Sequence, residues 1–234
     1  SRKHWVSAIA VLGVSSAGKL RLLSRLVPAL SFPDPNPDKL KLNARGLAVR
    51  KGIVYLAFDA GGLRILDLRN RSHPVEIGRY SNPALHGKPR AYNNVVLDGS
   101  RVYVTVDYCG LEVLNVANPA AIRRVSWFNP FECPGHPLYW FVSPGHTNEI
   151  TYDKQCKLLF MSAGKTDLMV VSVADPKHPV LRTSFPGVDN RIGTWGVSRS
   201  GDQLYLSYLC TLGIPFESRW SGVKAFSYDD PGCP

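Results

Sequence analysis

Residues 13–20 come close to a nucleotide-binding sequence. They read Gly-Val-Ser-Ser-Ala-Gly-Lys-Leu and follow an apolar, strand-like run. A phosphate-binding loop needs Ser or Thr directly after the lysine, because that hydroxyl ligates the Mg²⁺ ion. Leu20 stands in its place, and no strand–helix–strand pattern surrounds this segment or the Asp-Ala-Gly-Gly at 59–62. We therefore expect both segments to be turns between strands.

A second chemical candidate is a metal site within residues 127–146. Cys133, His136 and His146, with Glu132 nearby, are residue types that bind zinc. Their spacing is irregular and the segment is crowded with proline and glycine, so we expect neither a metal nor another cofactor. Ser143 stands near His146, but no Gly-x-Ser-x-Gly turn supports a serine nucleophile. The sequence therefore favours a non-enzymatic protein.

The cysteines bear on the cellular compartment. Their spacing shows neither a CxxC pair nor a zinc pattern, and the odd count leaves at least one thiol unpaired; they are Cys109, Cys133, Cys156, Cys210 and Cys233. In a chain rich in glycine and proline they indicate an oxidising compartment, with inert buried thiols as the alternative. We expect an extracytoplasmic protein, in the periplasm or at the cell surface.

The charge and composition of the chain limit the kinds of partner that it can bind. The formal charge of +10 is scattered over 234 residues and forms no dense basic run. Scattered charge of this kind indicates a solvated positive surface, with an acidic protein partner or peripheral association to an anionic membrane as the alternatives. No zinc finger, helix-turn-helix or RNP-type motif points to nucleic acid. No apolar stretch is long enough for a transmembrane helix.

The elements that must position any site are short strands in a repeat. Two short strands precede an echo of Gly-Leu-Arg-Ile-Leu-Asp-Leu (62–68) in each repeat, with matching positions 48, 57 and 55 residues apart at Leu66, Leu114, Val171 and Phe226. Turn formers stand where each first hairpin must reverse, at 50–52, 98–100, 153–155 and 200–202. The pattern predicts an all-β fold, a β-propeller of four-stranded antiparallel blades.

These repeats resemble a known family. Val/Ile-Tyr-Val/Leu, then Gly-Leu-x-Ile/Val-Leu-Asp-Leu/Val, then an Asn/Asp-Pro turn, is similar to the LVIVD repeat of bacterial and archaeal exported or cell-surface propellers. The pattern is clearest at 55–80 and 103–125, weaker at 158–185, and interrupted in the fourth repeat by 207–222. The resemblance implies a propeller and export, and it supplies no catalytic residues.

We expect one domain over residues 1–234, with repeats at about 44–82, 93–128, 148–186 and 194–228. Residues 1–32 fit a partial blade, so about five blades are in view. The two ends either complete one another or, as we favour, belong to a larger propeller with sequence before Ser1.

Loop lengths predict a working face. Strand directions in a blade place the inter-blade segments and the insertion at 209–221 on one face, and these are long; the opposite turns are short. Aromatic residues typical of protein-binding patches gather there. The alternative is that the loop folds back and buries these rings in a small core of its own. The predicted partner-binding residues are Phe128, Phe131, Tyr139, Trp140, Phe141, Arg219 and Trp220.

The same division sorts the cysteines. Cys109, Cys133 and Cys210 fall on the long-loop face, whereas Cys156 falls in a turn on the other. A bridge needs Cα atoms within about 7 Å, so we favour Cys109 with Cys133 over Cys133 with Cys156. Our functional hypothesis is a scaffold that binds another protein, as a cell-envelope subunit or an effector inhibitor or immunity protein. The alternative is an enzyme with a small-molecule or metal site at the propeller axis.

Overall fold

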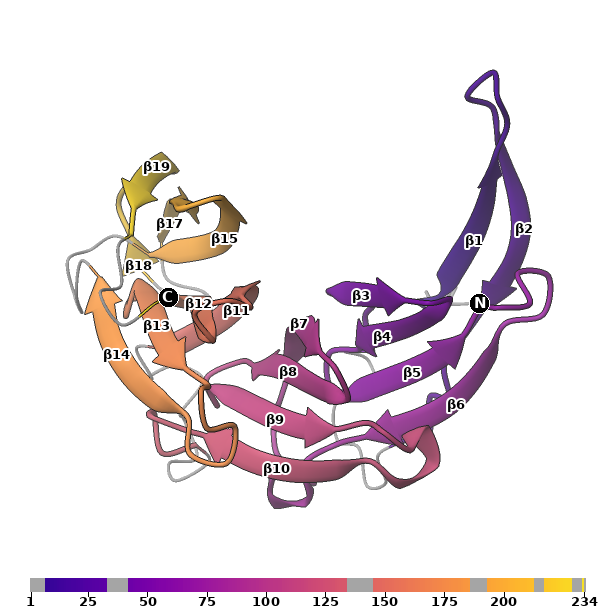
Figure 1. The fold of residues 1–234 in the computed structure, drawn as a ribbon, viewed down its shortest axis with the longest axis horizontal. Coiled ribbons are helices and arrows are strands. Elements are labelled where there is room, and N and C mark those ends of the chain that lie inside the picture. Colours follow the sequence, from indigo (N-terminus) through magenta and orange to yellow (C-terminus); the bar gives the residue numbers. More distant parts are fainter. Residues whose placement is uncertain are drawn as a thin grey trace.

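The computed structural model describes residues 7–32, 42–133, 145–185, 193–212, 217–228 and 233. Its strands form twisted antiparallel sheets set side by side along an open arc (Figure 1). The first strand of each blade lies nearest the concave side of the arc, and the fourth strand lies on its convex side. The predicted β-propeller of four-stranded antiparallel blades is confirmed.

We number the sheets as blades in chain order. Blade I is the pair β1 (Ile9–Val14) and β2 (Leu20–Leu26). Blade II contains β3 (Leu47–Arg50), β4 (Ile53–Ala57), β5 (Leu63–Asp67) and β6 (Val75–Tyr80). Blade III contains β7 (Tyr92–Asp98), β8 (Arg101–Val106), β9 (Leu111–Asn115) and β10 (Arg123–Phe128).

Blades IV and V are joined to each other by one pair of backbone residues. Blade IV contains β11 (Gly145–Asp153), β12 (Leu158–Gly164), β13 (Leu168–Ser172) and β14 (Val180–Phe185). Blade V contains β15 (Thr194–Ser200), β16 (Gln203–Tyr208) and β19 (Gly222–Ser227). The short pair β17 (Thr211–Leu212) and β18 (Glu217–Ser218) is inserted between β16 and β19. The pair Gly164 and Thr194 joins blades IV and V into one sheet.

Turn chemistry explains the first hairpin of each blade. Lys51 and Gly52, between β3 and β4, have φ of 50° and 77°, which is the paired left-handed conformation of a tight hairpin. Gly99 and Gly201 take positive φ at the equivalent turns. The segment that resembled a phosphate-binding loop is also a hairpin: the Ser15 amide donates to the Lys19 carbonyl at 2.9 Å, between β1 and β2.

The core lies between blades, so middle strands are apolar on both faces. Successive residues of β8 show this: Val102 packs in the cluster between blades II and III, and Tyr103 in the cluster between blades III and IV. Burial of these side chains supplies the main stabilisation, roughly 2 kcal/mol for each large aliphatic group. This arrangement gives the site a rigid support.

Two disulfides hold the described chain. Cys109 and Cys133 are bonded on the long-loop side of blade III, which confirms the predicted pairing. Cys156 is bonded to Cys233, a pairing that the sequence did not indicate, and Cys210 is an exposed free thiol. Within the described residues, no helix is long and apolar enough to span a membrane.

Candidate functional site

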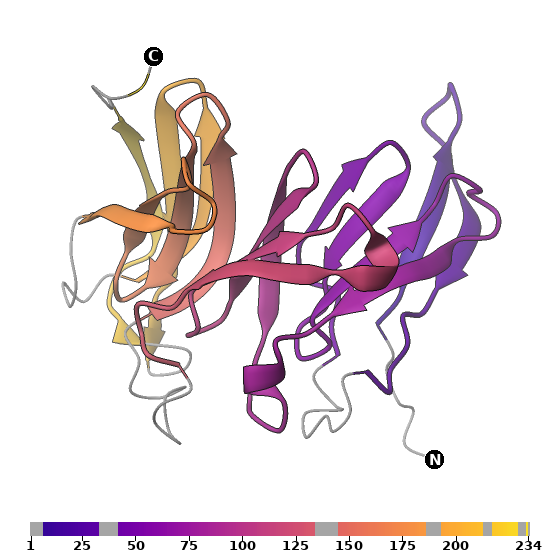
Figure 2. The ribbon, with the colours of Figure 1, turned by 60° about the horizontal axis from the view of Figure 1, so that its bottom comes forward.

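The two faces of the arc differ, as Figure 2 shows. Tight hairpin turns lie along its top, and the short 3-10 helix η1 (Pro83–Leu85) lies at its bottom in the connection between blades II and III. The first strand of a blade starts on the η1 side, and the second strand, which is antiparallel to it, ends there. The turns between second and third strands therefore lie on the η1 side. We call this side the long-loop face.

Buried carboxylates mark the long-loop face. Asp59, Asp107 and Asp167 each follow the second strand of a blade, and all three are buried. Asp59 and Asp167 have φ of 49° and 63°, a conformation that Asp adopts more readily than most residues. In blade III the neighbouring Tyr108 takes it instead, with φ of 57°.

Asp59 binds the chain that enters blade II. Its carboxylate accepts from Asn43 Nδ2 at 2.9 Å, and Arg45 Nε lies 3.3 Å from Oδ2. The backbone of Asp59 also pairs with that of Tyr92, at the start of blade III. The carboxylate therefore fixes the junction between blades II and III.

The side chain of Arg90 holds the loop that carries η1 through hydrogen bonds to backbone carbonyls. This side chain is fully buried, and its guanidinium donates to the carbonyls of Ala60, Leu85 and Lys88 at 2.9, 2.7 and 3.1 Å. Carbonyl partners make burial of the cation tolerable. The long loop is thus held in one conformation against the turn at 59–62.

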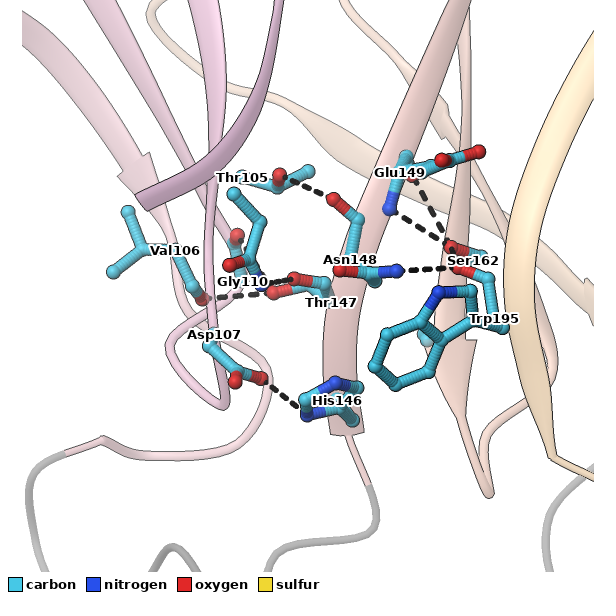
Figure 3. A network of polar contacts seen from close by, with 12 residues as sticks. Thr105, Val106, Asp107, Gly110, His146, Thr147, Asn148, Glu149, Ser162 and Trp195 are labelled. Carbon is cyan, nitrogen blue, oxygen red and sulfur yellow. Dashed lines mark hydrogen bonds and ion pairs between the residues drawn. The ribbon is translucent and has the colours of Figure 1, made fainter. Parts of the chain in front are cut away.

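The second buried carboxylate faces a histidine. Figure 3 shows His146, at the start of β11, directed at Asp107, with Nδ1 2.7 Å from Oδ1. The imidazole lies edge-on to Tyr108 and nearly parallel to Trp195, with centroids 5.2 and 5.3 Å apart. Burial raises the pKa of Asp107 above its ordinary value, against the opposing influence of His146 and Arg45. A carboxylate beside an imidazole orients the ring, as in catalytic dyads.

The strand that carries His146 is tied to both neighbouring blades. Thr147 Oγ1 donates to the Val106 carbonyl at 2.7 Å, and Asn148 Nδ2 donates to the Trp195 carbonyl at 2.7 Å (Figure 3). Ser162 Oγ reaches the same Trp195 carbonyl at 2.9 Å. These bonds satisfy backbone carbonyl groups of blade III and blade V.

The predicted aromatic residues divide into two groups. Phe128 and Phe131 are half-buried against the core between blades III and IV, and Gly145 leaves the space that the Phe131 ring occupies. Trp220 lies on blade V and is 38% exposed beside exposed Arg219. Tyr139, Trp140 and Phe141 lie outside the described residues.

One side of the Trp220 ring packs against other side chains of blade V. Its ring meets Tyr208 edge-to-face at 5.1 Å, and the Lys224 ammonium lies 5.0 Å from each of the two rings. An aromatic ring that is fixed on one side and open on the other is suited to anchoring a protein partner.

Two metal ligands considered from the sequence are otherwise engaged. Cys133 is in a disulfide and His146 pairs with Asp107, while His136 lies outside the described residues. In the described ranges, no three His, Cys, Asp or Glu side chains gather as a metal site would require.

Sequence reasoning missed the Asp107–His146 pair. The available signal was the aspartate that recurs after the second strand of successive repeats, at 59, 107 and 167. The histidine partner had no counterpart in the other repeats, so spacing alone did not connect the two residues.

Comparison with known proteins agrees with the geometry. Residues 43–82 match the model of the LVIVD repeat, which is the stretch from Asn43 through blade II. No curated protein sequence matches the chain.

Solved structures show the same fold at low identity. The computationally designed Ika4 protein is 10% identical, with a TM-score of 0.51 over 80% of this chain and 91% of its own. Sqt1 of Saccharomyces cerevisiae is 9% identical, with a TM-score of 0.59 over 87% of this chain and 51% of its own. A Bacteroides fragilis protein provisionally named 6-phosphogluconolactonase is 12% identical, with a TM-score of 0.59 over 98% and 64%. This chain therefore spans about half of Sqt1 and less than two thirds of the Bacteroides protein.

Proposed function

We propose that this LVIVD-repeat β-propeller is a non-enzymatic, extracytoplasmic scaffold that binds another protein through its long-loop face. The observation that carries the proposal is the pair Arg219 and Trp220, which the insertion between β16 and β19 exposes on that face. Tryptophan and arginine are the residues most often dominant in protein interfaces.

Rigidity supports the proposal. Arg90, Asp59 and Asp107 hold the connections of the long-loop face against the blades, so a partner meets a preformed surface. Preformed surfaces lose less conformational entropy on binding. The net charge of +10 favours a partner with an acidic surface.

Two disulfides in the described chain accord with an oxidising compartment, the periplasm or the cell surface. From the sequence, Tyr139, Trp140 and Phe141 join Phe128, Phe131, Arg219 and Trp220 as the proposed contacts. The partner would be the rest of a cell-envelope assembly, or an effector that this protein inhibits.

The test is comparative capture from the native source. Immobilised wild-type protein is compared with an Arg219→Ser/Trp220→Ser variant and with a Lys51→Ser/Arg69→Ser control on the short-turn face. We expect one partner, identified by mass spectrometry, to be retained by the wild type and control and lost by the first variant. Equal retention by all three proteins, each with unchanged thermal unfolding, would refute the long-loop surface.

A small-molecule or catalytic site at the axis is the second candidate, and the buried Asp107–His146 pair favours it. Metal analysis of the purified protein tests one form of this candidate. A stoichiometric metal that is lost in His146→Gln would favour the enzyme.

A further inference from the structure

The residue that ends the first strand of blade III ties this blade to the next. It is Asp98, whose Oδ2 accepts a hydrogen bond from the Tyr152 hydroxyl at 3.1 Å and lies 3.3 Å from Lys157 Nζ. Tyr152 and Lys157 belong to blade IV, and the ammonium lies 6.0 Å from the centroid of the Tyr152 ring. One carboxylate therefore joins a cation and a phenol at the junction between blades III and IV.

The junction between blades IV and V repeats this cluster. Asp153 ends the first strand of blade IV, and its Oδ2 lies 2.7 Å from Arg199 Nη2 and accepts a hydrogen bond from the Tyr228 hydroxyl. Arg199 Nε donates to the same hydroxyl at 2.6 Å, and the guanidinium carbon lies 5.7 Å from the centroid of the Tyr228 ring. A carboxylate, a cation and a phenol thus recur together.

The junction between blades II and III has the cation and the phenol without a carboxylate. Arg50 ends the first strand of blade II, where the next two blades have aspartate. Its Nη2 donates to the Tyr55 hydroxyl at 3.1 Å, its guanidinium carbon lies 5.6 Å from the centroid of that ring, and its Nη1 donates to the Gly99 carbonyl of blade III. Among the ion pairs of the described residues, none includes Arg50. The guanidinium is therefore held in place while its charge is not neutralised.

Arg50 and Tyr55 line a cavity of about 620 Å³ between blade II and the turns of blade III. It lies on the face opposite the long loops, which we call the short-turn face. Its apolar lining includes Ile53, Ile77 and Val116, of which Val116 is buried and the two isoleucines are half-buried. The cavity thus combines an apolar wall with a fixed cation, and its volume is within the range of sites for small molecules.

The charge of the cavity lining is positive. Lys51 and Arg69 line it together with Arg50, and none of its lining residues is acidic. Asp67 neutralises Arg69, whose Nε lies 3.0 Å from both oxygens of that carboxylate. Asp98, in the neighbouring strand end, pairs with blade IV instead. The cavity therefore attracts anions, and the guanidinium of Arg50 is the group that can bind one.

We propose that this cavity binds a small organic carboxylate with an apolar body, at the position that corresponds to the carboxylates of Asp98 and Asp153 in the next two junctions. The carboxylate of the ligand pairs with the Arg50 guanidinium and accepts a hydrogen bond from the Tyr55 hydroxyl, while its body packs on the apolar wall. The planar guanidinium suits carboxylate recognition because its N–H donors match the two oxygens. The cavity and the proposed protein-binding surface lie on opposite faces, so the inference goes beyond the proposed function and is tested independently of it.

The probe is phenylacetate, which carries a carboxylate and an apolar ring. Titration into isotope-labelled protein should give saturable chemical-shift changes centred on the backbone amides of residues 50–55 and 99–101. Phenylacetamide, the neutral isostere, and acetate, which lacks the ring, should each bind at least about tenfold more weakly. Equal affinity for phenylacetate and phenylacetamide, or shift changes centred elsewhere, would overturn the proposal. Tighter binding of inorganic phosphate at the same amides would overturn it too, in favour of a site for a mineral anion.

Ser100 supplies a matched pair of variants, because it is exposed and lines the cavity. Ser100→Asp adds a carboxylate to the lining and should weaken phenylacetate binding by at least about tenfold, whereas Ser100→Asn has the same size without the charge and should change it by less than about twofold. Arg50→Gln should abolish saturable binding, and Arg50→Lys should keep part of it. Equal affinities for the two Ser100 variants, with thermal unfolding as in the wild type, would refute the carboxylate site, as would full affinity in Arg50→Gln.

Discussion

His146 Nδ1 lies 2.7 Å from Asp107 Oδ1, with the two side chains 8% and 5% exposed, and this contact joins the inner strand of blade IV to blade III. A second histidine–aspartate pair, His178 with Asp175, has the same 2.7 Å separation but side-chain exposures of 78% and 57%. The protein thus contains a buried pair and an exposed pair of matching geometry. Their comparison separates the effect of burial from that of the contact.

Replacing the buried histidine should cost far more stability than replacing the exposed one. We expect His146→Ala to lower the free energy of unfolding by about 1–3 kcal/mol, because Asp107 then keeps a buried acceptor without its partner. His178→Ala should leave it almost unchanged, since exposed pairs contribute little to stability. Urea unfolding followed by tryptophan fluorescence measures both, and equal losses would contradict the structural role of the buried pair.

Glu112 should make stability depend on pH. Burial raises the pKa of this carboxyl from 4.5 to about 7, against hydrogen bonds from Tyr92 and Asn82. Between these two values the folded state binds more protons than the unfolded state, so stability falls as pH rises from about 4.5 to about 7. The loss is complete above pH 7.

The measurement compares wild type with Glu112→Gln in urea at about pH 5 and pH 8. Relative to the variant, the wild type should lose up to about 3 kcal/mol between the two conditions. Taking the difference between the two proteins removes the contribution of the other titrating groups, because both proteins contain them. A difference that stays constant with pH would show that Glu112 does not titrate in this range.

Thiol labelling should distinguish Cys210 from the other cysteines. The exposed free thiol of Cys210 is expected to react with N-ethylmaleimide in the folded protein, while the four cysteines in disulfides are protected. Peptide mass spectrometry should show one label before reduction and labels on all five cysteines after reduction and unfolding. A label on Cys156 or Cys233 without reductant would contradict the second disulfide.

Gly78 should tolerate no side chain. A methyl group there would lie 2.3 Å from the backbone oxygen of Pro119, so Gly78→Ala must force blades II and III apart. We expect a loss of about 1–3 kcal/mol in unfolding free energy. Gly13→Ala on β1 is the control, since its new methyl would only touch the Leu23 side chain at 3.4 Å. Equal melting temperatures for the two variants would disprove the close contact.

The propeller could be predicted because its signals are local. Strand alternation, the turn formers at 51–52, 99–100 and 201–202, and the recurring Gly-Leu/Val start of the third strand all act within a few residues. The Cys109–Cys133 bond was the favoured pairing, because strand direction placed Cys109, Cys133 and Cys210 on the long-loop face and Cys156 on the other.

The candidate sites were less accessible to sequence reasoning. Phe128 and Phe131 fall in an aromatic segment that resembles a binding patch, yet they also pack on the core between blades III and IV. Exposure depends on which blade lies opposite, and aromatic content does not report it. Whether the wider patch binds a partner stays a prediction.

The sequence by itself determined the repeat, the strand order within each blade and the face that carries the long loops, because each of these depends on residues close together in the chain. The tertiary structure alone decided that Asp107 meets His146, that Cys156 bonds Cys233, and that Lys224 lies 5.0 Å from the rings of Tyr208 and Trp220. These contacts join different turns, blades or insertions, and their distances depend on how the sheets twist and stack around the arc. No spacing in the sequence encodes that geometry.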